Sequence, residues 1–236
     1  MLCPGGSLAT SNTTADCPEL ADGTTFAFFP NTADLRRGDV ILTCPQPLKR
    51  RDDKFVVKMQ ELLGLPSQHA RFTHATVYDP AYWIWDVDLH HLVGRRLLSI
   101  YVDSQTCLEV IRPYTLTATQ RDDLLAKVAA KQSNEWTLAI TDDLKEKVEH
   151  SSLQQIQDYV KTQPHAKLMV DNTARSFTCA NVFLDSWNEL LGASQAIANS
   201  ANIPYGPGHL SQLAETHPHW FKVVEIEWLD IAHCLS

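Results

Sequence analysis

The segment from residue 71 to 88 places two runs of β-forming residues on either side of a turn signal. The first run is Arg71-Phe72-Thr73-His74-Ala75-Thr76-Val77-Tyr78, and the second is Tyr82-Trp83-Ile84-Trp85-Asp86-Val87-Asp88, with Asp79-Pro80-Ala81 between them. Runs of this composition around such a turn predict an antiparallel hairpin. If the hairpin is centred on Pro80, His74 lies directly opposite Asp86.

Direct cross-strand partners share one face of a sheet, with Cβ atoms roughly 5 Å apart. At that separation the Asp86 carboxylate can fix the tautomer of the His74 imidazole and stabilise its protonated form, as nucleophilic catalysis requires. The register decides this pairing, because a slip of one residue turns Asp86 to the opposite face. Asp88 is then a diagonal alternative.

A cysteine opens the strongest helical pattern in the second half of the chain. Thr178 precedes Cys179 and the apolar-periodic run Ala180 to Leu191, and Gly192 marks the predicted helix end. The free N–H groups and the dipole at a helix start favour a thiolate, so the position suits a nucleophile. The alternative is a cysteine that faces the core, which is the commoner role of a free thiol.

The order of these segments resembles a known family. Leu35-Arg36-Arg37-Gly38-Asp39-Val40-Ile41-Leu42 comes first, then Phe72-Thr73-His74-Ala75 with an acid twelve residues on, then Leu108-Glu109-Val110-Ile111-Arg112-Pro113, and last the helix-starting Cys179. This arrangement is similar to the permuted branch of the NlpC-type papain-like cysteine peptidases and amidases, in which the cysteine helix follows the histidine strand. The resemblance extends over roughly residues 35 to 228.

The resemblance implies an α+β, papain-like fold in which a mainly antiparallel sheet packs against the helix that carries the nucleophile. It also implies that Cys179 is the nucleophile, His74 the general base and acid, and Asp86 the residue that orients the imidazole. Phe177 stands near a position where the family often has a tyrosine, so the oxyanion donors stay unassigned.

By resemblance, the expected activity is a thiol hydrolase that cleaves amide bonds, with the peptides of bacterial peptidoglycan as substrate. Such an enzyme without a leader suggests a secreted antibacterial effector, delivered by a specialised secretion machine and neutralised by an immunity protein. Two alternatives stay open. One is a thiol acyltransferase or lipid-amide hydrolase of the same fold, and the other is a non-catalytic binding module.

Composition sets the domain organisation and excludes some partners. The chain has 236 residues, 44% of them hydrophobic, which suffices for one sizeable core. Residues 1–33 are polar and aperiodic and are predicted to be a flexible extension, with one catalytic domain at 34–236.

The net charge of −8 argues against a nucleic-acid partner. No apolar run approaches the roughly 20 residues of a membrane span.

The first residues lack the charged start and apolar segment of a signal peptide, so synthesis in the cytoplasm is expected, with later export to a target-cell periplasm by another route.

The six cysteines, at positions 3, 17, 44, 107, 179 and 234, lack metal-site spacing, and most are expected to be reduced. Cys3 and Cys17 could pair in an oxidising space. The ten histidines form no catalytic zinc motif, so neither a metal nor another cofactor is expected.

Patterns elsewhere predict the remaining elements. Helices are expected at 53–63, from an N-cap at Thr119 to Lys131, and from Ser151 or Ser152 to Lys161. Strands are expected at 40–42, 97–102, 108–112 and 221–228, and a long loop at 194–218. Asp39 and Arg112 are expected to have structural roles, and His69 to lie on the surface or in a loop.

Overall fold

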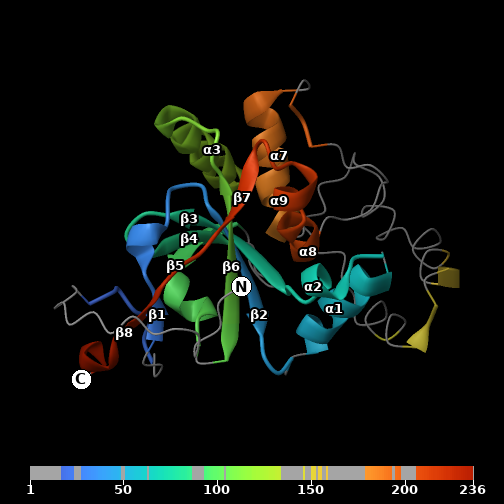
Figure 1. Ribbon diagram of the computed structural model, residues 1–236, viewed down its shortest axis with the longest axis horizontal. Coiled ribbons are helices and arrows are strands. Elements are labelled where there is room, and N and C mark those ends of the chain that lie inside the picture. Colours follow the sequence, from blue (N-terminus) through green and yellow to red (C-terminus); the bar gives the residue numbers. More distant parts are fainter. Residues whose placement is uncertain are drawn as a thin grey trace.

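The computed structural model describes residues 17–23, 28–48, 51–62, 64–86, 93–103, 105–133, 146, 150–152, 154–155, 158, 179–192, 195–197 and 206–235. Within this part, the chain forms a six-stranded sheet of order β5-β4-β3-β2-β6-β7 and a separate ribbon of β1 and β8 (Figure 1). Every strand pair is antiparallel. The predicted α+β class with a mainly antiparallel sheet is therefore confirmed.

The strands are β1 (Phe28–Pro30), β2 (Val40–Pro45), β3 (His74–Asp79), β4 (Trp83–Asp86), β5 (Gly94–Leu97), β6 (Thr106–Pro113), β7 (Phe221–Val224) and β8 (Trp228–Asp230). The α-helices are α1 (Arg51–Leu62), α2 (Ser67–Ala70), α3 (Ala118–Ala130), α7 (Cys179–Leu191), α8 (Pro207–Ser211) and α9 (Leu213–Thr216). Short 3₁₀ helices are η1 (Thr32–Asp34), η2 (Leu98–Tyr101), η3 (Lys131–Ser133) and η4 (Ala232–Cys234).

The central strand β2 is buried on both of its faces. Val40 and Leu42 belong to a core that includes residues of α3 and α7, the two helices that lie side by side in Figure 1. Ile41 points the other way, into a second core with Phe29 and Trp228 of the β1–β8 ribbon. Side chains alternate along a strand, so burial on both sides requires the continuous apolar run that β2 has.

The ordered fold begins before the predicted boundary at residue 34. Phe28 pairs with Asp230, and Phe29, which is 1% exposed, lies in the second core. Asn31 then caps η1, with its side chain accepting a hydrogen bond from the Ala33 N–H. The prediction that residues 1–33 form a flexible extension is thus wrong for residues 28–33, because the pairing partner lies about 200 residues away in β8. Residues 1–16 lie outside the described part.

A buried ion pair fixes the start of β2 to the end of β6. The fully buried Asp39 carboxylate accepts hydrogen bonds from Arg112 Nη2, at 2.7 Å, and from the backbone N–H of Arg36, at 2.8 Å. Ile111 pairs with Val40, so the register brings Arg112 opposite Asp39. The structural roles predicted for Asp39 and Arg112 are confirmed.

Two helix ends follow the glycine prediction, and one helix start differs from it. Gly64, two positions after the last residue of α1, and Gly192, directly after α7, have φ angles of +85° and +70°, a conformation that glycine adopts without strain. Helix α3 is capped by Thr117 rather than Thr119. The Thr117 hydroxyl accepts from the Gln120 N–H, and the Gln120 side chain accepts from the Thr117 N–H, a capping box that residue 119 could not form with Asp122 in the same way.

The chain departs from the predicted strands in two places. Residues 98–101 form the 3₁₀ helix η2 instead of continuing a strand. The predicted strand at 221–228 divides into β7, which pairs with β6, and β8, which pairs with β1. The predicted loop at 194–218 contains α8 and α9 within its described residues.

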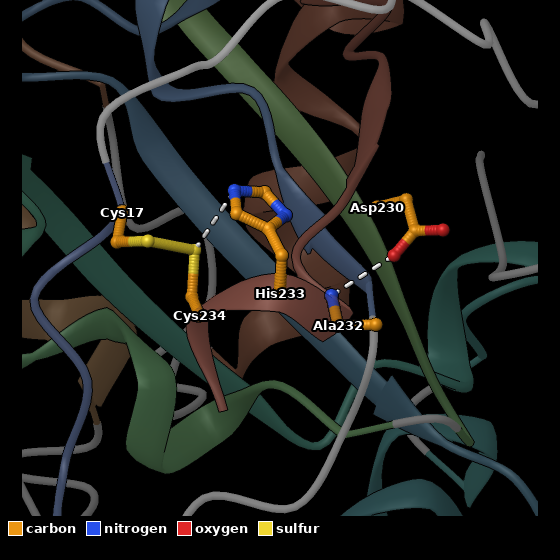
Figure 2. The surroundings of a disulfide bond; sticks show 5 residues. All are labelled: Cys17, Asp230, Ala232, His233 and Cys234. Carbon is orange, nitrogen blue, oxygen red and sulfur yellow. Dashed lines mark hydrogen bonds between the residues drawn. A yellow bond between two sulfur atoms is a disulfide. The ribbon is translucent and has the colours of Figure 1, made fainter. Parts of the chain in front are cut away.

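The oxidation state and the pairing of the cysteines also differ from the prediction. Cys17 is bonded to Cys234, across 217 positions of sequence, with His233 beside the bond (Figure 2). Cys107 is disulfide-bonded as well, whereas Cys44 and Cys179 are free thiols. The prediction that most cysteines are reduced is therefore wrong for the described part, and Cys17 does not pair with Cys3. A separation this long leaves no spacing motif in the sequence.

Among the described residues, no helix combines the length and the apolar character needed to cross a bilayer. Ser152 and Gln155 exchange hydrogen bonds typical of a helix start, as expected for a cap at Ser152. Most of the rest of that predicted helix, together with Phe177, Thr178 and Asp88, lies outside the described residues.

Candidate active site

Strands β3 and β4 carry His74 and Asp86, but in a different register from the predicted one. Val77 pairs with Trp85 and Asp79 with Trp83, so the hairpin is centred on Ala81 rather than Pro80. Ala81 and Tyr82 have positive φ angles of 62° and 70°, which turn the chain one residue later than expected. The predicted direct pairing of His74 with Asp86 is therefore wrong.

The error amounts to two residues on one strand, and a shift of two preserves the face. Burial along β4 alternates, with Ile84 and Asp86 buried and the two tryptophans partly exposed. Asp86 consequently shares a face with His74 and reaches it diagonally: its Oδ1 lies 2.5 Å from the His74 Nε2. The side chain of Asp86 has no exposed surface, whereas that of His74 is 18% exposed.

Cys179 is the first residue of α7, as predicted, and α7 packs against β3. Its side chain is half-buried and contacts the first core. The Cys179 sulfur lies close enough to the His74 ring to contribute to the raised pKa of the imidazole. Because Asp86 occupies Nε2, Nδ1 is the ring nitrogen left for Cys179. The structure thus brings together all three predicted residues.

Neighbouring charges shift the titration of both members of the His74–Asp86 pair. Burial lowers the pKa of His74, but the interactions with Cys179 and with the Asp86 carboxylate, which accepts a hydrogen bond from the ring, outweigh burial, so the net pKa lies well above the ordinary value. Burial raises the pKa of Asp86, but His74, Tyr101 and Arg96 together bring it below the usual value. Both shifts favour an imidazolium at His74 beside a carboxylate at Asp86.

Two residues of this site were missed in the sequence. The Tyr101 hydroxyl donates a hydrogen bond to Asp86 Oδ2, and its ring stacks on His74 with centroids 4.6 Å apart. Arg96 Nε lies 3.4 Å from the same Asp86 oxygen. Both residues follow the hairpin in sequence. Residues 97–102 were predicted to form a strand, whereas the 3₁₀ helix η2 turns the chain there and directs Tyr101 toward Asp86.

A second histidine is buried, contrary to the prediction for His69. Its Nδ1 lies 2.8 Å from Ser211 Oγ, and its Nε2 lies 3.3 Å from Glu215. Ser211 Oγ in turn donates to Glu109 at 2.6 Å. The serine is 3% exposed and its proton is engaged by a carboxylate, so this network connects α2, α8 and β6 and does not present a nucleophile.

Among the described residues, the candidate metal-ligating cluster is Cys17, His233 and Cys234. Figure 2 shows the imidazole beside the bonded sulfurs, with His233 Nε2 3.4 Å from Cys234 Sγ. Cysteine binds zinc only as a thiolate, and both of these sulfurs are committed to the disulfide, which leaves His233 as the one available ligand of the cluster. The residues present therefore do not fit a metal in this oxidation state.

Comparisons of the chain with protein-family models, with curated proteins and with solved structures give no match.

Proposed function

We propose that this chain is a thiol hydrolase that cleaves amide bonds, built on a permuted NlpC-type, papain-like fold. The observation that carries the proposal is the convergence of Cys179, His74 and Asp86 from three separate elements. A sulfur at a helix start, an imidazole with a raised pKa and a buried carboxylate are the groups that covalent acyl transfer needs.

The proposed reaction has two steps. The Cys179 thiolate attacks the carbonyl carbon of the amide, and His74, as imidazolium, gives a proton to the leaving amine. His74 then takes a proton from a water molecule, which attacks the thioester; the C–S bond breaks, the acid leaves, and the Cys179 thiolate and the His74 imidazolium are restored. Asp86 holds the imidazole plane and stabilises its positive charge throughout.

The proposed substrate is the peptide part of bacterial peptidoglycan, and the proposed setting is the periplasm of a target cell, with a cognate immunity protein as partner. The disulfides at Cys17–Cys234 and at Cys107 support delivery to an oxidising compartment, where such bonds persist. The substrate class itself rests on the resemblance of the sequence to the family.

The test is digestion of purified sacculi, with soluble fragments identified by mass spectrometry. Wild type is expected to release peptide fragments, while Cys179→Ala and His74→Ala release none. Cys44→Ala is the matched control, because Cys44 is the other free thiol among the described cysteines and is buried in the core. Release that survives both active-site substitutions would reject the mechanism. Absence of release by wild type would reject the substrate and direct the search to lipid amides.

A further inference from the structure

We propose that Tyr101 is a positioning residue for both members of the His74–Asp86 pair, acting on the carboxylate through its hydroxyl and on the imidazole through its ring. The inference deepens the proposed thiol hydrolase and rests on it. It assigns to η2 a part in the reaction that the three predicted residues do not account for.

The hydroxyl of Tyr101 completes the coordination of the Asp86 carboxylate. His74 Nε2 uses Oδ1, and Tyr101 donates the hydrogen bond to Oδ2, from which the Arg96 Nε is 3.4 Å away, so the two oxygens are held from two directions. A carboxylate held by one oxygen can rotate about its terminal bond, which has a broad torsional minimum. Contact at both oxygens removes this freedom and keeps Oδ1 directed at the imidazole.

The ring of Tyr101 restricts the imidazole independently of the hydroxyl. The two rings are inclined by only 22°, with centroids 4.6 Å apart, so the phenol covers one face of His74. During the proposed reaction His74 gains and loses a proton at Nδ1 while Nε2 stays bonded to Asp86. A stacked neighbour opposes rotation of the imidazole out of this plane and excludes water from the covered face.

The backbone that carries Tyr101 is itself well fixed. Leu98, at the start of η2, is fully buried, and its N–H donates to the Tyr82 carbonyl at 2.8 Å. Ser99 is 4% exposed and accepts a hydrogen bond from the Ala21 N–H. Strand β5, directly before η2, pairs with β4, and Asp86 lies opposite Gly94. Tyr101 and Asp86 are therefore held by one continuous set of backbone hydrogen bonds.

A purely structural tyrosine would behave differently from a positioning one. Tyr101 also packs against the second core, so truncation is expected to lower stability in either case. Loss of the hydroxyl should raise the pKa of Asp86 under either role, because the hydrogen bond is lost in both cases. Only a positioning role predicts that loss of the hydroxyl alone also changes the reactivity of Cys179. Tyr101→Phe separates the two roles, because it keeps the ring and the packing and removes the donor.

The experiment compares wild type with Tyr101→Phe, Tyr101→Leu and the control Tyr114→Phe. Tyr114 is a suitable control, because its exposed side chain also donates one hydrogen bond from its hydroxyl, to the Pro218 carbonyl and not to a residue of the site. The readouts are the NMR titration of the Asp86 carboxyl and the rate at which iodoacetamide alkylates Cys179. The second is followed by peptide mass spectrometry well below the unfolding temperature, and neither readout requires a substrate.

Tyr101→Phe is expected to raise the pKa of Asp86 and to slow alkylation roughly three- to tenfold, the range that loss of one hydrogen bond produces. Tyr101→Leu should slow it further, because the ring is lost too, and Tyr114→Phe should match wild type. An alkylation rate in Tyr101→Phe equal to that of wild type would overturn the proposal, whether or not the pKa of Asp86 changes. If Tyr101→Phe shows the expected changes while sacculi stay intact, the positioning role stands and the proposed substrate is wrong.

Discussion

Asp86 Oδ1 lies 2.5 Å from His74 Nε2, although these two residues are diagonal neighbours and not cross-strand partners. The pairing of Val77 with Trp85 places Asp86 two positions away from the direct partner of His74. The contact survives this offset because side chains alternate with period two, so both groups still point to one face. The imidazole ring of His74 is large enough to reach a diagonal neighbour.

Replacement of Asp86 by asparagine is expected to reduce turnover by about 10³- to 10⁴-fold, with little effect on substrate binding. The amide removes the negative charge that supports the imidazolium and can present the wrong group to Nε2. The measurement is kcat and KM on the amide substrate. Asp79→Asn, in the same hairpin, is the control, since Asp79 pairs with Arg95 and lies apart from His74. Equal losses in the two variants would contradict the assigned role of Asp86.

The His74–Asp86 pair should make the stability of the protein depend on pH in both the alkaline and the acidic range. The raised pKa of His74 means that its contribution is complete below the unfolded value of about 6.5 and is lost as pH rises through the folded pKa. The lowered pKa of Asp86 means that its contribution is complete above about 3.9 and is lost as pH falls through the folded pKa.

The check is thermal unfolding of wild type and His74→Ala from pH 3 to pH 9, with the stability difference plotted against pH. The extra stability of wild type over His74→Ala should decrease as pH rises through the raised pKa of His74. A difference that is constant from acid to alkaline pH would show that His74 does not titrate with the expected shift.

Replacement of Arg112 by methionine is expected to destabilise the fold by about 3–5 kcal/mol, because it leaves the carboxylate of Asp39 buried without its main partner. Urea unfolding measures the change. Arg37→Gln is the control: Arg37 forms its ion pair with Asp122 at the surface, where such pairs contribute less than about 1 kcal/mol. A loss for Arg112→Met as small as that of the control would mean that water or Arg121 compensates for the missing guanidinium.

Removal of the Cys17–Cys234 disulfide by Cys17→Ser is expected to reduce the free energy of unfolding by about 2–4 kcal/mol, since the bond closes a loop over most of the chain (Figure 2). A phosphine reductant should lower the melting temperature of wild type more than that of the variant. An equal effect of the reductant on both proteins would assign the redox sensitivity to the Cys107 disulfide alone.

Local patterns predicted much of the fold and the three residues of the candidate site. The apolar run of β2, the helix that starts at Cys179 and the glycines that end α1 and α7 each depend on neighbours within a few positions. The structure retains them as predicted. His74 and Asp86 could be associated because a hairpin is also local, and the even error in register did not change the face.

Tertiary structure decided everything that joins distant positions. The pairing of β1 with β8, the Cys17–Cys234 bond and the contact of Cys179 with His74 each close a long loop. Closing such a loop costs chain entropy, and the packing of whole helices and strands offsets this cost. A short window of sequence does not show which distant elements will pack together. Tyr101 belongs to the same class: its hydroxyl meets Asp86 because residues 98–101 turn as a 3₁₀ helix that packs against the second core.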